Sequence, residues 1–211
     1  MNSLNIQKIS KFRPDNSIIK QAAGILNDGG LIVAPTETRY GLLGRIDDIT
    51  VLKKLYALKK RKFNLPSAIF VRDYNEMFEF GCESKLACIL AEKFLPGPLT
   101  IVLSDKSGLP EPIVTEGKIG IRYSSSPVIA KLLKRVTFNI TATSANISGG
   151  GNLGNIEEIA AVFGTRIDLY LDGGRLDALP STVVDCSCDK YKVLRTGAFT
   201  REEIRKKIVK L

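Results

Sequence analysis

The segment FNITATSANISGGG at residues 138–151 joins a strand-like stretch to a polar stretch that ends in three glycines. Apolar residues alternate with Asn139 and Thr141 at its start, which is the two-residue period of a β-strand. The hydroxyl and amide side chains that follow can donate hydrogen bonds to an anion, and glycine lets the backbone approach it closely. Taken alone, the segment is more typical of a turn with nothing bound. Other stretches must therefore support an anion site.

A second polar stretch, PTETRYGL at residues 35–42, directly follows the apolar run LIVA at residues 31–34. The apolar run predicts a buried strand. We therefore expect the threonine and arginine side chains after it where a strand leaves the sheet. Because open α/β sheets bind ligands at such strand ends, this stretch is a candidate for the same site.

A third stretch is the basic run KKRK at residues 59–62. Asp47 and Asp48 precede apolar residues at helical spacing, and they predict a helix whose last turn carries the basic run. Cations at a helix C-terminus are favourable by about 0.3–1 kcal/mol each. Capping of this helix is therefore the alternative to anion binding.

The composition limits the chemistry that the chain can perform. Its 211 residues include 31 basic and 22 acidic side chains, for a formal net charge of +9, and no histidine. The charge favours anionic partners such as nucleotide or RNA, although a solvated basic surface explains it equally well. The lack of histidine excludes Ser-His-Asp and Cys-His nucleophiles within the chain, histidine metal ligands and a histidine pH switch. Chemistry must depend on lysine, arginine, hydroxyls, carboxylates and backbone dipoles.

Cysteine spacing and hydropathy predict a cytoplasmic protein. Cys82, Cys88, Cys186 and Cys188 lack the spacing of a zinc site, and no signal peptide points to an oxidising compartment. No apolar run approaches the ~18 residues needed to cross a bilayer. We therefore expect reduced thiols, a cytoplasmic location and no membrane partner.

Strand-like and helix-like segments alternate along most of the chain, without a linker, a repeat or a low-complexity tract. This pattern predicts an α/β fold, a single domain over residues 1–211 with a twisted mixed β-sheet flanked by helices and an open, basic concave face. Alternation at residues 118–123 places Lys118, Gly120 and Arg122 on one side of a strand. The expected strands are residues 2–8, 31–34, 67–71, 99–103, 118–123, 138–142, 167–171, 182–186 and 191–195, and the expected helices lie at about residues 16–28, 48–62, 83–95, 127–133, 155–163 and 200–211.

Several motifs occur in a fixed order from about residue 18 to about residue 197. They are PTETxYGL at 35–42, KxR at 59–61, LPGPLT at 95–100, TSANxSG at 143–149, PSTVVD at 180–185 and LRxG at 194–197, together with Arg122. Each motif is weak alone, but together they resemble the YrdC-like family of threonylcarbamoyl-AMP synthases. The chain is similar to the short, single-domain form of that family.

The resemblance implies a nucleotidyltransferase. The family joins L-threonine, bicarbonate and ATP, with Mg²⁺ on the nucleotide, into threonylcarbamoyl-AMP and pyrophosphate. A threonylcarbamoyl transferase complex then uses the product to modify the adenosine beside the tRNA anticodon. By resemblance, the catalytic residues are Lys59 and Arg61. The ATP-binding residues are Lys59, Phe63, Lys118, Ser144, Asn146, Asn152 and Arg195, and the threonine-binding residues are Thr36, Arg122, Ala142 and Ser181.

The residue chemistry agrees with this reaction, because three anionic reactants need several fixed cations in one cleft. No general base is evident, so we expect positioning and charge stabilisation to dominate. Glu37 either pairs one of the cations or has a catalytic or Mg²⁺-related role. Residues 62–67 depart from the family pattern, which makes the threonine-pocket wall at Ser67 to Val71 the least secure part of the comparison.

Two other functions stay open at this point. A non-catalytic module that binds tRNA or double-stranded RNA is suggested by the net charge and by a basic final helix, which a capping box at Thr200 and Glu203 predicts. The basic residues of that helix are more typical of a solvated face, and no RNA motif with interleaved aromatic residues is present. A relative with a different amino-acid or acyl substrate is the third possibility.

Overall fold

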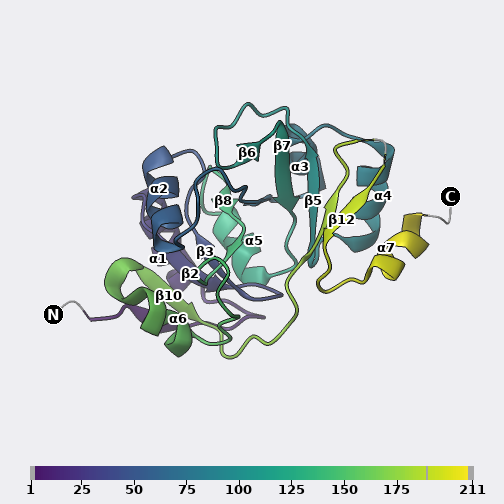
Figure 1. Ribbon diagram of the computed structural model, residues 1–211. Helices are drawn as coiled ribbons and strands as arrows, with labels where there is room; N and C mark the ends of the chain where they lie inside the picture. The colour runs from purple at the N-terminus through teal and green to yellow at the C-terminus, as the bar shows by residue number, and fades with distance from the viewer. Residues whose placement is uncertain (1–2, 189, 209–211) are drawn as a thin grey trace.

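The computed structural model describes residues 3–188 and 190–208, and in them the chain forms two β-sheets with helices packed against them (Figure 1). The strands are β1 (Ile6–Lys8), β2 (Ile32–Pro35), β3 (Tyr40–Leu43), β4 (Ile69–Phe70), β5 (Leu99–Ser104), β6 (Val114–Thr115), β7 (Lys118–Arg122), β8 (Ile140–Thr141), β9 (Thr143–Ser144), β10 (Leu169–Asp172), β11 (Thr182–Asp185) and β12 (Lys192–Arg195). The helices are α1 (Asn16–Asn27), α2 (Ile49–Leu58), α3 (Tyr74–Phe80), α4 (Lys85–Phe94), α5 (Pro127–Leu133), α6 (Ile156–Phe163), η1 (Gly164–Arg166) and α7 (Arg201–Ile208). The predicted α/β class is confirmed.

The first sheet has five strands in the order β1-β10-β2-β3-β9. β10 is parallel to both β1 and β2, whereas β3 is antiparallel to both β2 and β9. Ile32 and Ala34 of β2 share a hydrophobic cluster with α1 and α5, and Val33 shares another with α2 and α6. Helices therefore cover both faces of this sheet, which confirms the buried strand predicted from residues 31–34.

The second sheet has seven strands, in the order β12-β11-β5-β7-β4-β8 with β6 paired to β7. In β5, Leu99, Ile101 and Leu103 belong to a hydrophobic cluster with α3, α4 and α7, and the alternate residues Thr100 and Val102 line a cavity. β7 and β11 alternate in the same way. Helices thus cover one face of the second sheet, and the other face is left to the cavity.

The prediction of a single mixed sheet is wrong, and residues 138–151 show why. β8 pairs with β4 in the second sheet, but after Ala142 the chain enters β9, which pairs with β3 in the first sheet. The Thr141 hydroxyl donates to the Leu42 carbonyl at 3.0 Å and accepts from the Gly44 amide at 3.2 Å. These bonds join the two sheets where the chain passes between them, so this segment connects two sheets rather than simply leaving one.

The start of α2 follows the predicted cap at Asp48, and α1 and α6 begin with caps of the same kind. Asp15, Asp48 and Asn155 each accept hydrogen bonds from amides in the first turns of α1, α2 and α6. The capping box of α7 is confirmed, because Glu203 donates its amide to the Thr200 hydroxyl at 3.2 Å and accepts the Thr200 amide at 2.7 Å. α3 was not predicted. The final residues of the predicted last helix, 209–211, and residue 2 of the first predicted strand lie outside the described residues.

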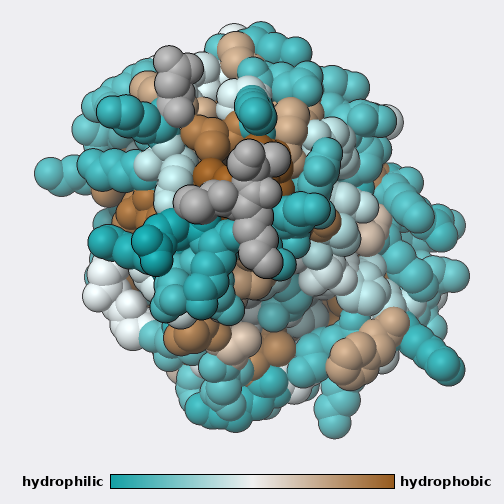
Figure 2. All heavy atoms as spheres, turned by 90° about the vertical axis from the view of Figure 1, so that its right-hand side faces the viewer, coloured by the Kyte–Doolittle hydropathy of each residue, from teal (hydrophilic) through white to brown (hydrophobic). Residues whose placement is uncertain are grey.

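No helix among the described residues is both long and apolar enough to cross a membrane. Figure 2 shows the side of the molecule that carries α4 and α7 in Figure 1. Hydrophilic side chains dominate this surface, and the apolar residues visible on it form small groups.

Candidate functional site

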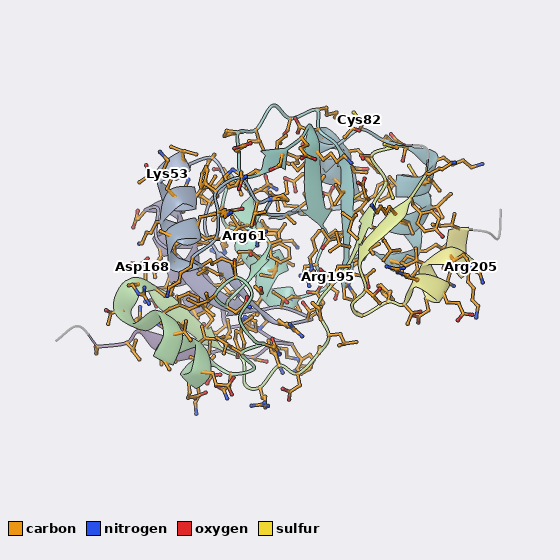
Figure 3. All side chains as sticks on the ribbon, viewed as in Figure 1. Lys53, Arg61, Cys82, Asp168, Arg195 and Arg205 are labelled. Carbon is orange, nitrogen blue, oxygen red and sulfur yellow. The ribbon has the colours of Figure 1, made fainter. Side chains whose placement is uncertain are left out.

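A cavity of about 1180 Å³ lies between the two sheets. Its walls come from the loop between β2 and β3, the residues after α2, β9 with the loop that follows it, and the uncovered face of the second sheet. In Figure 3, Arg61 and Arg195 lie in the middle of the molecule, whereas Lys53 and Arg205 lie on its outer sides. The cavity brings together most of the predicted site residues: Thr36, Lys59, Arg61, Lys118, Arg122, Ala142, Ser144, Asn146, Ser181 and Arg195.

Two predicted ATP-binding residues are not among those that line the cavity. The Phe63 ring packs edge-on against Tyr56, with 5.2 Å between ring centroids, and it contributes to the hydrophobic core. Asn152 is exposed after the glycine run. The structure therefore does not bring these two side chains to the others.

Buried polar atoms without partners concentrate at the cavity. Among the described residues, Arg61 Nε, Arg122 Nε, Thr115 Oγ1 and Ser148 Oγ are buried and make no hydrogen bond. All four residues line the cavity. Because an unpaired buried polar group costs about 1–3 kcal/mol, this concentration indicates a site that a polar ligand completes.

Lys59 is a buried cation at the centre of the cavity wall. It forms the C-cap of α2, its relative exposure is 2%, and its Nζ donates to the backbone carbonyls of Ser144 and Asn146, the latter at 2.9 Å. Burial and, as the smaller cause, the nearby positive charge of Arg61 together lower the pKa of Lys59 to about 7. Both carbonyls are neutral acceptors, so the charge of Lys59 remains available to an anionic ligand.

The basic run does not lie in the last turn of α2, as predicted, because the helix ends at Leu58. Lys60 has φ 48°, and this left-handed conformation turns the chain while the Arg61 amide closes the helix on the Tyr56 carbonyl at 3.0 Å. The Arg61 side chain then donates from Nη2 to the Pro66 carbonyl at 2.9 Å. Among the described residues, neither Lys59 nor Arg61 forms an ion pair.

Arg122 ends β7 and is also buried, with 7% exposure. Its Nη2 donates to Glu37 Oε1 and to Thr38 Oγ1, both at 2.7 Å. The second Glu37 oxygen accepts from the Ser124 hydroxyl. Glu37 therefore forms an ion pair with a cation of the site, which is one of the two roles left open by the sequence. Its partner is Arg122 and not Lys59 or Arg61.

Ser181 and Arg195 form a second polar group at the same cavity. Arg195 Nη2 donates to the Ser181 carbonyl and hydroxyl oxygens, both at 2.9 Å. The Ser181 hydroxyl also shares a hydrogen bond of 2.9 Å with Thr100. Thr36 has a structural task in addition to lining the cavity, because its hydroxyl donates to the Arg39 carbonyl at 2.7 Å.

The loop after β9 is held by its own side chains. Ser144 donates its hydroxyl to Asn146 Oδ1 at 2.6 Å, and Asn146 Nδ2 donates to the Gly150 carbonyl at 3.1 Å. The Ala142 amide donates to the Ala68 carbonyl at 2.7 Å, which fixes the loop to the wall at residues 67–71. Within that wall only β4 is a strand, so the strand predicted over residues 67–71 is shorter than expected.

The cavity also contains charged residues to which the sequence assigned no role or a different role. Lys190 and Lys192 line it and were not predicted. Arg39 also lines it; the sequence placed Arg39 at the strand exit of the PTETRYGL stretch but gave it no ligand. Lys118 was predicted, but it forms an ion pair with Asp185 at 2.8 Å. Its charge is therefore less available to a ligand than those of Lys59 and Arg61.

The described residues contain no group of three or more histidine, cysteine, aspartate or glutamate side chains that could hold a metal ion. Asp185 and Glu116 are the carboxylates found among the described residues that line the cavity, and Asp185 is already paired with Lys118. These residues do not fit a metal site held by the protein.

Comparisons with known proteins agree with this site. The profile of the Sua5/YciO/YrdC family, described as "Telomere recombination", matches residues 24–197. A protein of Methanocaldococcus jannaschii named putative threonylcarbamoyl-AMP synthase is 36% identical over 85% of this chain and 85% of its own length. The threonylcarbamoyl-AMP synthase of Bacillus subtilis is 33% identical over 88% of this chain, which spans 55% of that longer protein.

Solved structures show the same fold. The structure of P. abyssi Sua5 complexed with L-threonine has a TM-score of 0.89 and 31% identity, and it covers 96% of this chain and 60% of its own. The structure of E. coli YciO has a TM-score of 0.86 and 26% identity, and it covers 97% of this chain and 100% of its own. A family profile that spans most of the sequence and relatives above 30% identity leave one assignment: the chain belongs to the Sua5/YciO/YrdC family.

Proposed function

We propose that this protein is an L-threonylcarbamoyladenylate synthase, a nucleotidyltransferase that forms threonylcarbamoyl-AMP and pyrophosphate from L-threonine, bicarbonate and ATP. The observation that carries the proposal is the cavity, where Lys59, Arg61 and Arg195 lie near Arg122 without ion-pair partners among the described residues. Threonine carboxylate, bicarbonate and triphosphate are all anions, so such a cavity suits all three. The printed names of the relatives support the same activity.

The residues suggest how the reaction proceeds. Arg122 binds the threonine carboxylate. The threonine ammonium group loses one proton to solvent, and the resulting amine forms a bond to the carbon of bicarbonate with loss of water. The carbamate oxygen then attacks the α-phosphorus of ATP, and the bond to the departing pyrophosphate breaks. Lys59 and Arg61 stabilise the charge that develops on the phosphate oxygens, because fixed cations in a partly desolvated site need no reorganisation.

The remaining roles follow from the same proposal. Mg²⁺ would enter with ATP and would neutralise part of the phosphate charge, and the Ser144–Asn146 loop contacts the nucleotide. The product passes in the cytoplasm to transferase machinery that modifies the adenosine beside the tRNA anticodon. The ATP-binding roles of Phe63 and Asn152 stay predictions, because neither side chain lines the cavity.

Incubation of the purified protein with L-threonine, bicarbonate, Mg²⁺ and ATP tests the proposal. We expect release of pyrophosphate that depends on both threonine and bicarbonate, together with an acid-labile adenylate that mass spectrometry detects. Folded protein that releases no more pyrophosphate than a control without threonine would contradict the synthase.

The RNA-binding alternative and a different amino-acid substrate give distinct results in the same assays. A non-catalytic module would bind RNA with a steep salt dependence and would not respond to threonine. A relative with another substrate would release pyrophosphate with serine or another amino acid more readily than with threonine. The relatives' names favour the synthase over the RNA-binding module.

A further inference from the structure

Arg39 is a cavity residue without an assigned role. It ends the four-residue loop that connects β2 to β3. The Thr36 hydroxyl accepts the Arg39 amide at 3.2 Å and donates to the Arg39 carbonyl at 2.7 Å, so the backbone of Arg39 is held on both sides. The loop therefore presents this side chain to the cavity from a fixed position.

The Arg39 guanidinium is mostly free to bind a ligand. Within the described residues its side chain makes one hydrogen bond, from Nε to the Ala178 carbonyl at 3.3 Å. Both terminal nitrogens remain available, and they form the side of the guanidinium fork that binds carboxylate or phosphate with two hydrogen bonds. Ala178 is a neutral partner, so it leaves the positive charge of Arg39 uncompensated.

Arg39 lies close to Arg195, because Arg39 donates to the Ala178 carbonyl, Arg195 donates to the Ser181 carbonyl three residues further on, and both side chains line the cavity. Burial lowers the pKa of Arg195, and the neighbouring charges of Arg122 and Arg39 lower it further. Among the three, only Arg122 forms an ion pair in the described residues, with Glu37. Arg195 donates to the neutral oxygens of Ser181. One carboxylate thus balances three guanidinium groups at this end of the cavity.

We propose that Arg39 completes, together with the predicted ATP-binding residue Arg195, a second oxyanion subsite beside Arg122, which binds a second anionic group of the bound reactants. The inference rests on the proposed function for its ligands, because that reaction places two kinds of oxyanion next to the threonine carboxylate. One is the carboxylate of the carbamate intermediate, and the other is a phosphate of ATP or pyrophosphate. Both suit a pair of arginine forks without a protein counter-ion.

Isothermal titration calorimetry with Arg39→Gln, Arg39→Lys and a matched control tests the subsite. Arg13→Gln is the control, because Arg13 is exposed and does not line the cavity. The ligands are ATP, pyrophosphate, L-threonine and N-carboxymethyl-L-threonine, a stable dicarboxylate that carries a second carboxylate on nitrogen. We expect Arg39→Gln to weaken the binding of ATP, of pyrophosphate or of the dicarboxylate about tenfold or more, and Arg13→Gln to leave all affinities unchanged.

The pattern of losses distinguishes the two sources of the anion. Weaker binding of ATP and pyrophosphate, with dicarboxylate binding unchanged, assigns the subsite to phosphate. Loss of a wild-type preference for the dicarboxylate over threonine assigns it to the carbamate. Arg39→Lys keeps the charge without the fork, so we expect an intermediate affinity, and thermal unfolding checks that each variant is folded.

Unchanged affinity of folded Arg39→Gln for all four ligands would overturn the subsite. This outcome is independent of the synthase assay. If the wild-type protein released no pyrophosphate but Arg39→Gln still lost anion binding, the proposed function would fail and the subsite would stand.

Discussion

The two sheets of this protein differ in how many of their faces are covered by helices. Helices α1 and α5 cover one face of the first sheet, and α2 and α6 cover the other, so residues 31–34 are apolar without interruption. Helices α3, α4 and α7 cover only one face of the second sheet. Its strands alternate apolar residues with Thr100, Arg122, Val183 and other residues that line the cavity. A strand that is covered on both faces needs apolar residues at every position, whereas a strand that is covered on one face needs them only at alternate positions.

The comparison explains where chemistry is possible in this fold. A sheet that is buried on both faces has no room for a ligand, but it supplies rigid loops at its strand ends, such as the one that carries Thr36 and Arg39. The half-covered sheet supplies the floor of the cavity. Lys59 and Arg61, which follow α2 of the first sheet, lie opposite that floor, so the site needs both sheets.

The largest effect is expected from removal of the central cation of the cavity. Lys59→Ala should lower kcat/KM for the synthase reaction about 10²–10³-fold, because the variant loses a fixed, buried charge at the phosphates. Lys53→Ala is the matched control: it lies on the same helix, is exposed and points to the outside (Figure 3). We expect its pyrophosphate release to equal that of the wild type. Equal losses in both variants would place Lys59 outside the reaction.

Substitution of one valine in each sheet by threonine tests whether helices cover the two sheets unequally. Val33→Thr puts a hydroxyl into the fully buried strand β2 and should lower the free energy of unfolding by about 1–3 kcal/mol. Val183→Thr makes the same change on the cavity face of β11, which is half-buried, and should cost less than about 0.5 kcal/mol. Urea denaturation measures both. Similar losses would mean that the second sheet is covered on both faces.

ATP affinity should depend on pH through Lys59, whose pKa is lowered to about 7 by burial and by Arg61. Above this pH the free protein loses the ammonium charge, and bound phosphate favours it, so binding takes up a proton. We expect ATP affinity to fall by up to about tenfold per pH unit above pH ~7.5, a loss of about 1.4 kcal/mol each.

Calorimetry in two buffers with different ionisation enthalpies measures this proton uptake directly. Lys59→Arg retains its charge over the whole range and serves as the control, so its proton uptake should vanish. An identical number of protons taken up by both proteins at pH ~8.5 would show that another group titrates.

The smallest effect concerns the helix that covers the second sheet at its β12 end. Thr200→Ala removes the hydroxyl that accepts the Glu203 amide, and it should cost about 1 kcal/mol of unfolding free energy with little change in pyrophosphate release. Thr200→Ser keeps the cap and should restore the wild-type value. A large loss of activity in folded Thr200→Ala would instead connect α7 with the cavity.

Local signals predicted much of the fold because they depend on neighbouring residues. Spacing and side-chain chemistry predicted the cap at Asp48, the capping box at Thr200, the buried strand after Gly30 and the alternation in β7. The predicted cations and hydroxyls all line one cavity. The side chains of Phe63 and Asn152, which were also predicted, do not line it. Local patterns did not predict α3 or the left-handed turn at Lys60.

By itself, the sequence determined the α/β class, most helix starts and the residue types that an anion site requires, because these follow from periodicity and from the absence of histidine. Only the tertiary structure decided that there are two sheets. β4, β8 and β9 have two residues each, and β8 and β9 pair with strands more than 60 residues away in sequence. Such short strands have no periodicity of their own, so long-range packing fixes them. Long-range packing also determines that Arg39 and Lys192 line the cavity and that Glu37 pairs with Arg122.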